Sequence, residues 1–290
     1  MTALRQRMIQ DLELRGYSER TVEAYVHPVA QLARFYKTTP DELTEAQIRE
    51  YLVHLSTVQK VSRSTHTIAL CSIKFFYQQT LGRAWTVFDI ARPKGEKKLP
   101  VVLSRDEVWR VLAAVRSPVY RVCLTTIYAC GLRLLEGTHL QVPDVDGERK
   151  LLHVSHGKGA KDRLVPLPDA TLALLREHWR THRNPLWLFP TGTRSHAAPL
   201  HDPLVGPISR SSLQSAFVRA VQQAGVHKRA HVHTLRPSYA THLLEAGVAL
   251  QLIQEYLGHS SARTTTIHTH LTRELRDGAL EPINGLMPHR

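Results

Sequence analysis

The chain has 290 residues and a net charge of +13, with 42% hydrophobic and 22% charged residues, which is the composition of a soluble globular protein with one large or two modest domains. Its apolar runs are too short to cross a bilayer, and charged residues interrupt the N-terminal stretch where a signal peptide would be apolar, so we expect a cytoplasmic protein. Three cysteines are too few and too scattered for a disulfide framework, and we expect them to be small buried hydrophobes: Cys71, Cys123 and Cys130.

Basic residues are in excess along the whole chain. There are 15 basic against 10 acidic residues in positions 1–100, and 23 against 15 in the remainder. A spread excess of this kind favours a protein that holds a long polyanion along its body rather than by one basic tail. A basic protein without a nucleic-acid partner would have the same composition, so charge alone leaves both alternatives open.

The first ninety residues predict a small bundle of four helices. Ser18 is a candidate N-cap, and apolar residues follow it at helical spacing, although Pro28 must bend or split this helix. A capping box formed by Thr44 and Gln47 begins the next helical pattern, and a fourth pattern follows it. Four helices with short connections are typical of a helical bundle.

Residues 91–103 break this pattern with prolines, a glycine and four basic residues. Such a composition indicates an interdomain linker, and its charge predicts that it passes close to phosphate. We therefore expect a helical domain over residues 1–90, a basic linker over 91–103 and a second domain over 104–290.

The second domain is predicted to be mainly helical with a small sheet. A capping box from Ser104 to Glu107 opens a helix, and a more apolar helix is interrupted at Gly131. The apolar runs 151–154 and 163–167 then flank "SHGKGAKD", which indicates a hairpin with a glycine-rich turn. Helical patterns dominate again beyond this hairpin. The fold class is therefore mainly α with a small β-sheet, or α+β.

Several stretches of this domain carry residues suited to binding a phosphate. Arg133 follows a glycine, Lys158 lies between two glycines at the hairpin tip, and His233 and Arg236 lie one helical turn apart. His259 follows an amphipathic helix. Arginine binds the non-bridging oxygens of a phosphate with two parallel hydrogen bonds, and lysine or histidine can move protons to the bridging oxygens. Taken singly, Arg133 and Lys158 are equally typical of an ordinary surface.

The motifs "GLRLLE", "HGKGAKDR", "HTLRPSYATHLLEAG" and "YLGHSS", in this order, resemble those of the tyrosine recombinases, or phage-type integrases, which include the Xer-type enzymes. The resemblance covers nearly the whole chain. It implies an N-terminal SAM-like core-binding domain, a C-terminal catalytic domain and no metal or nucleotide cofactor. It also implies binding to a duplex DNA recombination site, as a homotetramer on two duplexes or with a partner recombinase, and a nucleoid-associated location in the cytoplasm.

The resemblance also assigns roles to the two arginines. Arg133 and Arg236 match the pair that neutralises the scissile phosphate and its pentacoordinate transition state. Glu136 matches an acidic position that would orient Arg133, although an exposed helical glutamate is an alternative. Pro237 stands where the family often has histidine, which puts the aim of Arg236 in question.

The remaining matches concern proton transfer. Lys158 matches the hairpin lysine, a general acid for the leaving 5'-hydroxyl. His233 matches a residue that acts in proton transfer and phosphate binding. His259 matches a hydrogen-bond donor to the phosphate.

The attacking tyrosine of the family would lie nine residues after His259, and the sequence has His268 there, within "IHTH". Tyr239 or Tyr256 could act instead, but both match core positions. His268 could itself attack, since imidazole forms covalent intermediates. A metal site of His268 and His270 would lack further ligands. Two functions therefore stay open: a recombinase that cleaves and rejoins DNA, or a decayed, accessory or engineered member of the same fold that binds DNA without cleaving it. A third class of function is a histidine-rich metal protein, for which the only evidence is the number of histidines, 18.

Overall fold

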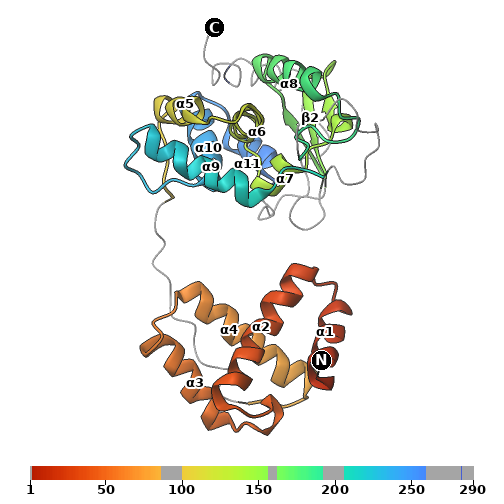
Figure 1. Cartoon of the computed structure of the whole chain (residues 1–290), viewed down its shortest axis with the longest axis vertical. Coiled ribbons are helices and arrows are strands. Elements are labelled where there is room, and N and C mark those ends of the chain that lie inside the picture. Colours follow the sequence, from red (N-terminus) through yellow and green to blue (C-terminus); the bar gives the residue numbers. More distant parts are fainter. Residues whose placement is uncertain (1, 86–99, 156–161, 192–205, 259–281, 283–290) are drawn as a thin grey trace. The chain divides into compact units, whose positions relative to one another are not determined.

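A computed structural model describes residues 2–85, 100–155, 162–191, 206–258 and 282. The chain divides into two compact units, Met1–Lys97 and Lys98–Arg290, which are described separately below (Figure 1). None of the helices in these ranges has the length and apolar character needed to cross a membrane.

Within its described residues, 2–85, the N-terminal unit has four α-helices around one apolar core, as the sequence predicts. Thr44 and Gln47 form the expected capping box, with Gln47 N donating to Thr44 Oγ1 at 3.3 Å and Thr44 N donating to Gln47 Oε1 at 2.9 Å. Ser18 is the N-cap residue of its helix, but its hydroxyl pairs with that of Thr21 at 3.0 Å rather than with a backbone N–H. The elements are α1 (Ala3–Glu13), α2 (Glu19–Tyr36), the 3-10 turn η1 (Pro40–Glu42), α3 (Glu45–Thr57), α4 (Arg63–Phe75) and the π-helical turn η2 (Phe76–Thr80).

Helix α2 runs without interruption through Pro28, which is buried in the core, so the alternative of a split helix is wrong. The proline removes one backbone hydrogen bond, but α2 packs against α4 and α1, and it buries apolar residues before and after Pro28. Tertiary packing therefore outweighs the local cost of the proline.

The C-terminal unit is mainly helical with one small antiparallel sheet, so the predicted fold class is confirmed. The hairpin strands pair from Leu151 with Pro166 to Val154 with Arg163, and a two-residue strand that the sequence did not predict extends the sheet to the order β1-β2-β3. The strands are β1 (Val145–Asp146), β2 (Leu151–Val154) and β3 (Arg163–Pro166). The helices are α5 (Arg105–Ala114), α6 (Pro118–Ala129), α7 (Leu134–Thr138), α8 (Asp169–His182), α9 (Arg210–Gln223), α10 (Leu235–Glu245) and α11 (Leu250–Leu257), with 3-10 turns η4 (Val142–Asp144) and η5 (Val232–Thr234).

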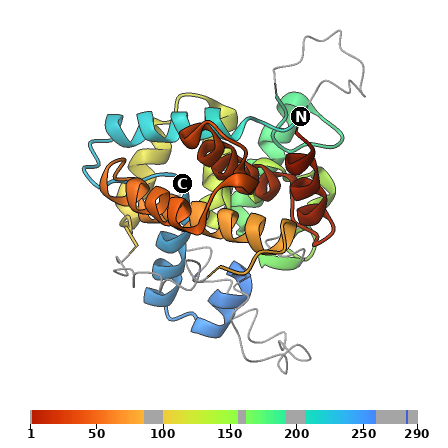
Figure 2. The same cartoon turned by 90° about the horizontal axis from the view of Figure 1, so that it is seen from below.

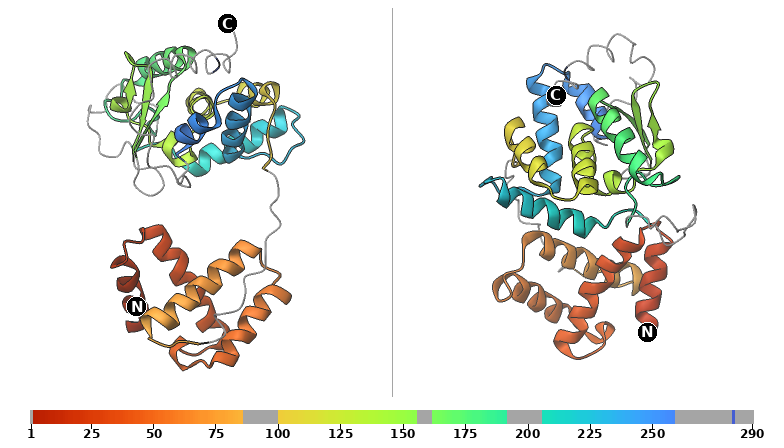
Figure 3. Two further views of the ribbon diagram at one scale, coloured as in Figure 1. Left: turned by 180° about the vertical axis from the view of Figure 1, so that it is seen from behind. Right: turned by 45° about the horizontal axis from the view of Figure 1, so that its top comes forward.

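Helix α6 is the centre of this unit. Its residues 122–129 are all buried, with the sheet and α8 on one side of it and α5, α9 and α10 on the other (Figures 1 and 3). Helix α11 lies beside α10 (Figure 2). Cys123 and Cys130 are buried in this core as expected, whereas Cys71 in the N-terminal unit is only half-buried. Burial raises the pKa of the Cys130 thiol to about 12, so this group is an apolar packing residue.

The described end of the predicted linker is fixed to α10. Leu103 is fully buried, and its backbone N–H donates to Ser238 Oγ at 2.9 Å. Lys228 Nζ donates to Val102 O at 3.1 Å and to Glu107 Oε2 at 2.6 Å. Residues 91–99 of the predicted linker lie outside the described ranges, and the boundaries of the domains stay a prediction.

Candidate functional site

A sharp turn after α6 begins the site. Gly131 has φ +58°, and a Cβ atom on it would lie 2.5 Å from Tyr239 Cδ1, so both the backbone conformation and the close packing require glycine. The turn makes Arg133 the N-cap residue of the short helix α7. It also leaves the Gly131 carbonyl free to accept a hydrogen bond from outside the helix.

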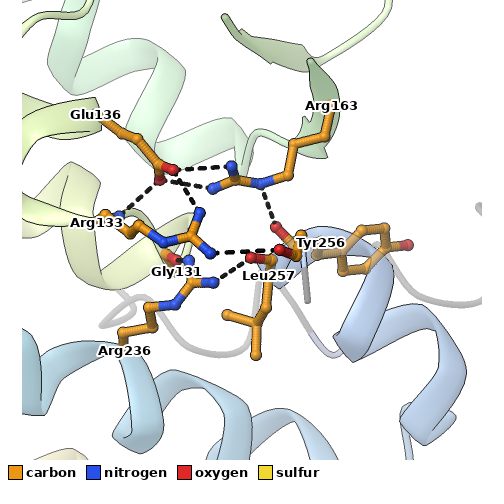
Figure 4. Close-up of polar contacts among 8 residues, drawn as sticks. Gly131, Arg133, Glu136, Arg163, Arg236, Tyr256 and Leu257 are labelled. Atoms are coloured by element: carbon orange, nitrogen blue, oxygen red, sulfur yellow. Dashed lines mark hydrogen bonds and ion pairs between the residues drawn. The ribbon is translucent and has the colours of Figure 1, made fainter. Parts of the chain in front are cut away.

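Glu136 is the acceptor at the centre of the site (Figure 4). Its Oε1 accepts from Arg133 Nη1 at 2.7 Å and from Arg163 Nη1 at 2.9 Å, while its Oε2 accepts from Arg133 N at 2.7 Å and from Arg163 Nη2 at 2.6 Å. The side chain is only 6% exposed, so the alternative of an exposed helical glutamate is wrong. Burial alone would raise the pKa of Glu136, but the hydrogen bonds from Arg163 and then Arg133 outweigh it and hold the pKa at about 2.

Arg236 projects from the first turn of α10 and is held by two backbone carbonyls. Its Nη1 donates to Gly131 O at 2.5 Å, and its Nη2 donates to Leu257 O. Burial, followed by repulsion from Arg133 and Arg163, lowers the pKa of Arg236 to about 10, so it remains charged at neutral pH.

Pro237 is accommodated at the third position of α10. The N–H groups of a helix's first turn have no partner within the helix, so a proline there costs no intrahelical hydrogen bond. It does not divert Arg236 from its two carbonyl acceptors, and the concern raised by the sequence at this position does not hold.

The C-terminal turn of α11 accepts a hydrogen bond from each of the three arginines. A helix C-terminus carries a partial negative charge and unpaired carbonyls, both of which suit guanidinium groups. Three consecutive carbonyls take part. The pairs are Arg163 Nε with Tyr256 O at 2.7 Å, Arg236 Nη2 with Leu257 O, and Arg133 Nη2 with Gly258 O at 3.3 Å.

The charges of this site do not balance. In the described part of the chain, Glu136 is the only carboxylate bonded to Arg133 or Arg163, and the Arg236 bonds go to backbone carbonyls, so three positive charges gather around one negative charge. The Arg133 side chain is 26% exposed and Arg236 is half-buried, whereas the Arg163 side chain is 8% exposed. The arrangement is therefore suited to an external anion that reaches Arg133 and Arg236.

Comparisons with known proteins identify the family. A family model described as the phage integrase family matches residues 101–274, and one described as the phage integrase N-terminal SAM-like domain matches residues 4–87. The chain belongs to the phage integrase family. Its site motifs all lie within the first of these matches.

Relatives within the phage integrase family align over most of their length. The chain is 38% identical to a putative integrase/recombinase of Sinorhizobium fredii, over 91% of this chain and 83% of the relative. It is 33% identical to the tyrosine recombinase XerC of Lactobacillus leichmannii, over 90% of this chain and 91% of the relative. A solved structure of a lambda integrase tetramer bound to a Holliday junction has a TM-score of 0.71 at 16% identity, over 93% and 79% of the two chains, which shows likeness of fold alone.

Two of the six site residues expected for this integrase family donate hydrogen bonds to the carbonyls at the end of α11. These are Arg133 and Arg236. His233 lies in η5 and is exposed; desolvation, then the charges of His231 and Arg236, lower its pKa, so it is neutral at pH 7. The other three, Lys158, His259 and His268, lie outside the described residues, as does the candidate metal ligand His270. Within the described ranges, no three His, Cys, Asp or Glu side chains gather as a metal site.

Arg163 is the site residue that sequence reasoning missed. It is the first residue of β3, and it lies 27 positions from Glu136 in the chain. Its sequence signals are a place at the end of the motif "HGKGAKDR", to which no role was assigned, and at the start of the apolar run "RLVPL". Neither signal indicates a partner for Arg163, because a charged residue at the start of a strand is common.

Tyr239 and Tyr256 are packing residues, as the family comparison of the sequence suggested. Tyr239 is fully buried and Tyr256 is 4% exposed. Burial raises the pKa of Tyr239 well above its usual value. Neither phenol is therefore placed to attack an external phosphate.

We expect Tyr239→Phe to leave the free energy of unfolding unchanged, or to raise it by up to about 1 kcal/mol. The Tyr239 hydroxyl is buried and has no hydrogen-bond partner in the described structure, so its removal relieves a desolvation cost. Urea denaturation of the parent protein and the variant measures the difference. A loss of about 1 kcal/mol or more would contradict this prediction and give the hydroxyl a structural role.

Proposed function

We propose that this member of the phage integrase family is a site-specific DNA recombination protein, which clamps duplex DNA and binds the scissile phosphate with Arg133 and Arg236. One observation carries the proposal: the guanidinium groups of Arg133 and Arg163 share the Glu136 carboxylate while Arg236 is held beside them by backbone carbonyls, so the cluster carries more positive than negative charge. A phosphodiester supplies the missing negative charge. The net charge of +13 and a fold neighbour described as bound to a Holliday junction support DNA as the partner.

In this proposal the arginines act on the transition state. Negative charge builds up on the non-bridging oxygens as the phosphorus becomes pentacoordinate, and fixed guanidinium donors stabilise that charge without having to reorganise. Lys158 would protonate the leaving 5'-hydroxyl, while His233 and His259 would donate to or relay protons around the phosphate. No cofactor is needed if the bond energy is kept in a covalent protein–DNA link.

The assembly and its place in the cell are part of the same proposal. We infer a homotetramer on two duplexes, or an assembly with a partner recombinase, acting on nucleoid DNA in the cytoplasm. The fold neighbour described as a tetramer supports this arrangement.

A second function is favoured by one feature of the chain: a DNA-binding member of the fold that holds the phosphate but does not cleave. His268 stands where the family's tyrosine is expected, and no tyrosine follows Tyr256 in the sequence. Tyr239 and Tyr256 are buried. Both functions share the phosphate clamp and differ in whether a covalent link forms.

The clamp is tested without any need for cleavage. A binding site is first selected from a pool of random duplexes, and the phosphates of the selected site are then replaced one at a time by neutral methylphosphonates. We expect duplex binding that weakens steeply with salt, and one position per strand where the neutral group weakens binding about tenfold more than its neighbours. Absence of duplex binding at low salt, or equal effects at all positions, would overturn the proposal.

A further inference from the structure

Arg163 joins three separate elements of the site through its guanidinium group. From the start of β3, its Nη1 and Nη2 donate to the two oxygens of Glu136 in α7, and its Nε donates to Tyr256 O at the end of α11. One edge of the planar guanidinium group therefore faces Glu136, and the Nε–H points to the end of α11 (Figure 4). With 8% of its side chain exposed, Arg163 faces protein rather than an external ligand.

We propose that Arg163 is a positioning residue, which fixes Glu136 and the last turn of α11 so that Arg133 and Arg236 bind the scissile phosphate. The inference rests on the proposed function. Arg163 itself does not contact the DNA. It acts through the two groups that hold the phosphate-binding arginines: the Glu136 carboxylate and the terminal carbonyls of α11.

The first step of the argument is competition for Glu136. Arg163 occupies one position on each carboxylate oxygen, and the Arg133 side chain takes a single bond to Oε1. Without Arg163, the carboxylate would be free to form a bidentate pair with Arg133, which is the preferred geometry of arginine with a carboxylate. Arg133 would then present fewer donors to a phosphate, and Glu136, with one counter-ion instead of two, would repel the phosphate more strongly.

The second step concerns α11. The same guanidinium that holds Glu136 also holds Tyr256 O, and the next two carbonyls accept from Arg236 and Arg133. The contact is closely packed, because a Cβ atom on Gly258 would lie 3.0 Å from Arg163 Cδ. Arg163 therefore sets the distance between α7 and the end of α11, which both phosphate-binding arginines share.

The third step is that only arginine fits this role. A lysine keeps the charge but offers one compact ammonium group, which cannot bond both Glu136 oxygens and Tyr256 O in the fixed directions of a guanidinium. Arg163→Lys therefore separates position from charge. Arg149→Lys is a matched control, because Arg149 belongs to the same unit, its side chain is 63% exposed and it contacts Asp146 at 4.0 Å outside the site.

The experiment repeats the replacement of single phosphates by methylphosphonates in the selected duplex, and it measures binding by variants of the full chain. We expect Arg163→Lys to lose most of an about tenfold preference for phosphate at the sensitive position, while binding to the fully substituted control duplex stays within about twofold of the parent. Arg149→Lys should keep the preference. If Arg163→Lys keeps it as well, the inference is wrong.

A double-mutant cycle separates positioning from direct contact. If Arg163 acts through Arg133 and Arg236, then Arg163→Lys should cause a clearly smaller further loss of the preference in an Arg133→Gln background than in the parent chain. An additive loss would make Arg163 a phosphate ligand and overturn the inference. If the parent chain itself shows no sensitive phosphate, the proposed function fails, whereas a sensitive parent and an equally sensitive Arg163→Lys refute only the positioning role.

Should Arg163→Lys prove unfolded in thermal melting, the pair variant Arg163→Gln with Glu136→Gln replaces it. Removing both charges together leaves neither partner as an unpaired buried ion, so folding is better preserved than with one charge removed. This variant is also expected to lose the phosphate preference, because neither glutamine reproduces the bidentate contact. Retention of the preference would overturn the inference.

Discussion

Glu136→Gln is expected to lower the free energy of unfolding of the C-terminal unit by about 3 kcal/mol at pH 7. Glutamine has nearly the shape of glutamate, so packing is kept, but Arg163 then retains a buried charge without a counter-ion. The amide group also places donor hydrogens against the donors of Arg133 and Arg163, which Glu136 now accepts. Urea denaturation followed by tryptophan fluorescence measures the change, since three of the four tryptophans lie in this unit.

Glu148→Gln is the matched control. Glu148 is exposed in the turn between β1 and β2, so the same chemical change there should alter stability by less than about 0.5 kcal/mol. A loss below about 1 kcal/mol in Glu136→Gln would contradict the prediction. It would mean that a neutral amide beside Arg133 and Arg163 supports the folded state nearly as well as the carboxylate does.

The same substitution changes how stability depends on pH. The pKa of Glu136 falls from the ordinary value of 4.5 in the unfolded chain to about 2 in the folded one, so the unfolded state binds the proton more tightly. The stabilisation, on the order of 3 kcal/mol, is therefore complete above about pH 4.5 and is lost as the pH falls towards 2. We expect the stability difference between the parent and Glu136→Gln to narrow over that window.

Features that depend on neighbours in the sequence could be predicted from the sequence. The capping boxes at Thr44 and Ser104 and the end of a helix at Gly131 each depend on contacts within a few residues. All three are present in the structure. The antiparallel pairing of β2 with β3 is local as well, because it joins two apolar runs that are separated by a short stretch of sequence.

The network around Glu136 could not be predicted in the same way. Arg163 reaches Glu136 only because β3 packs beside α7, and no local pattern encodes that distance. The terminal carbonyls of α11 are backbone groups, which every residue has, so sequence motifs carry no sign that they bind arginines. Family resemblance identified Arg133 and Arg236 from the sequence. The terminal carbonyls of α11 that hold them in place could be identified only from the structure.

His268→Tyr is expected to produce a covalent protein–DNA adduct that the parent chain does not form. A phenol can attack the phosphate to give a phosphotyrosine, which keeps the bond energy for rejoining and survives denaturation. Arg133 and Arg236 are held by the end of α11, so under the proposed function the substitution would supply a nucleophile without changing the residues proposed to bind the phosphate. A nicked duplex carrying the selected site traps the product, which denaturing electrophoresis resolves.

Two controls give this result its meaning. His268→Phe has the ring without the hydroxyl and should form no adduct, which shows that oxygen rather than ring size is required. Arg236→Gln combined with His268→Tyr should slow adduct formation by about 100-fold or more, since it removes a fixed donor to the developing oxyanion. An adduct that forms at equal rates with and without Arg236 would place the chemistry outside the clamp.

The outcome also decides between the two proposed functions. An adduct in the His268→Tyr protein alone would mean that the chain keeps a working phosphate clamp and lacks only the attacking group, which is the cleavage-deficient member of the family. An adduct in the parent chain that His268→Ala abolishes would make imidazole the nucleophile, and the chain a recombinase with a phosphohistidine link. No adduct in either protein, with the phosphate preference intact, would show that binding the scissile phosphate through Arg133 and Arg236 is separable from placing position 268 in line with it.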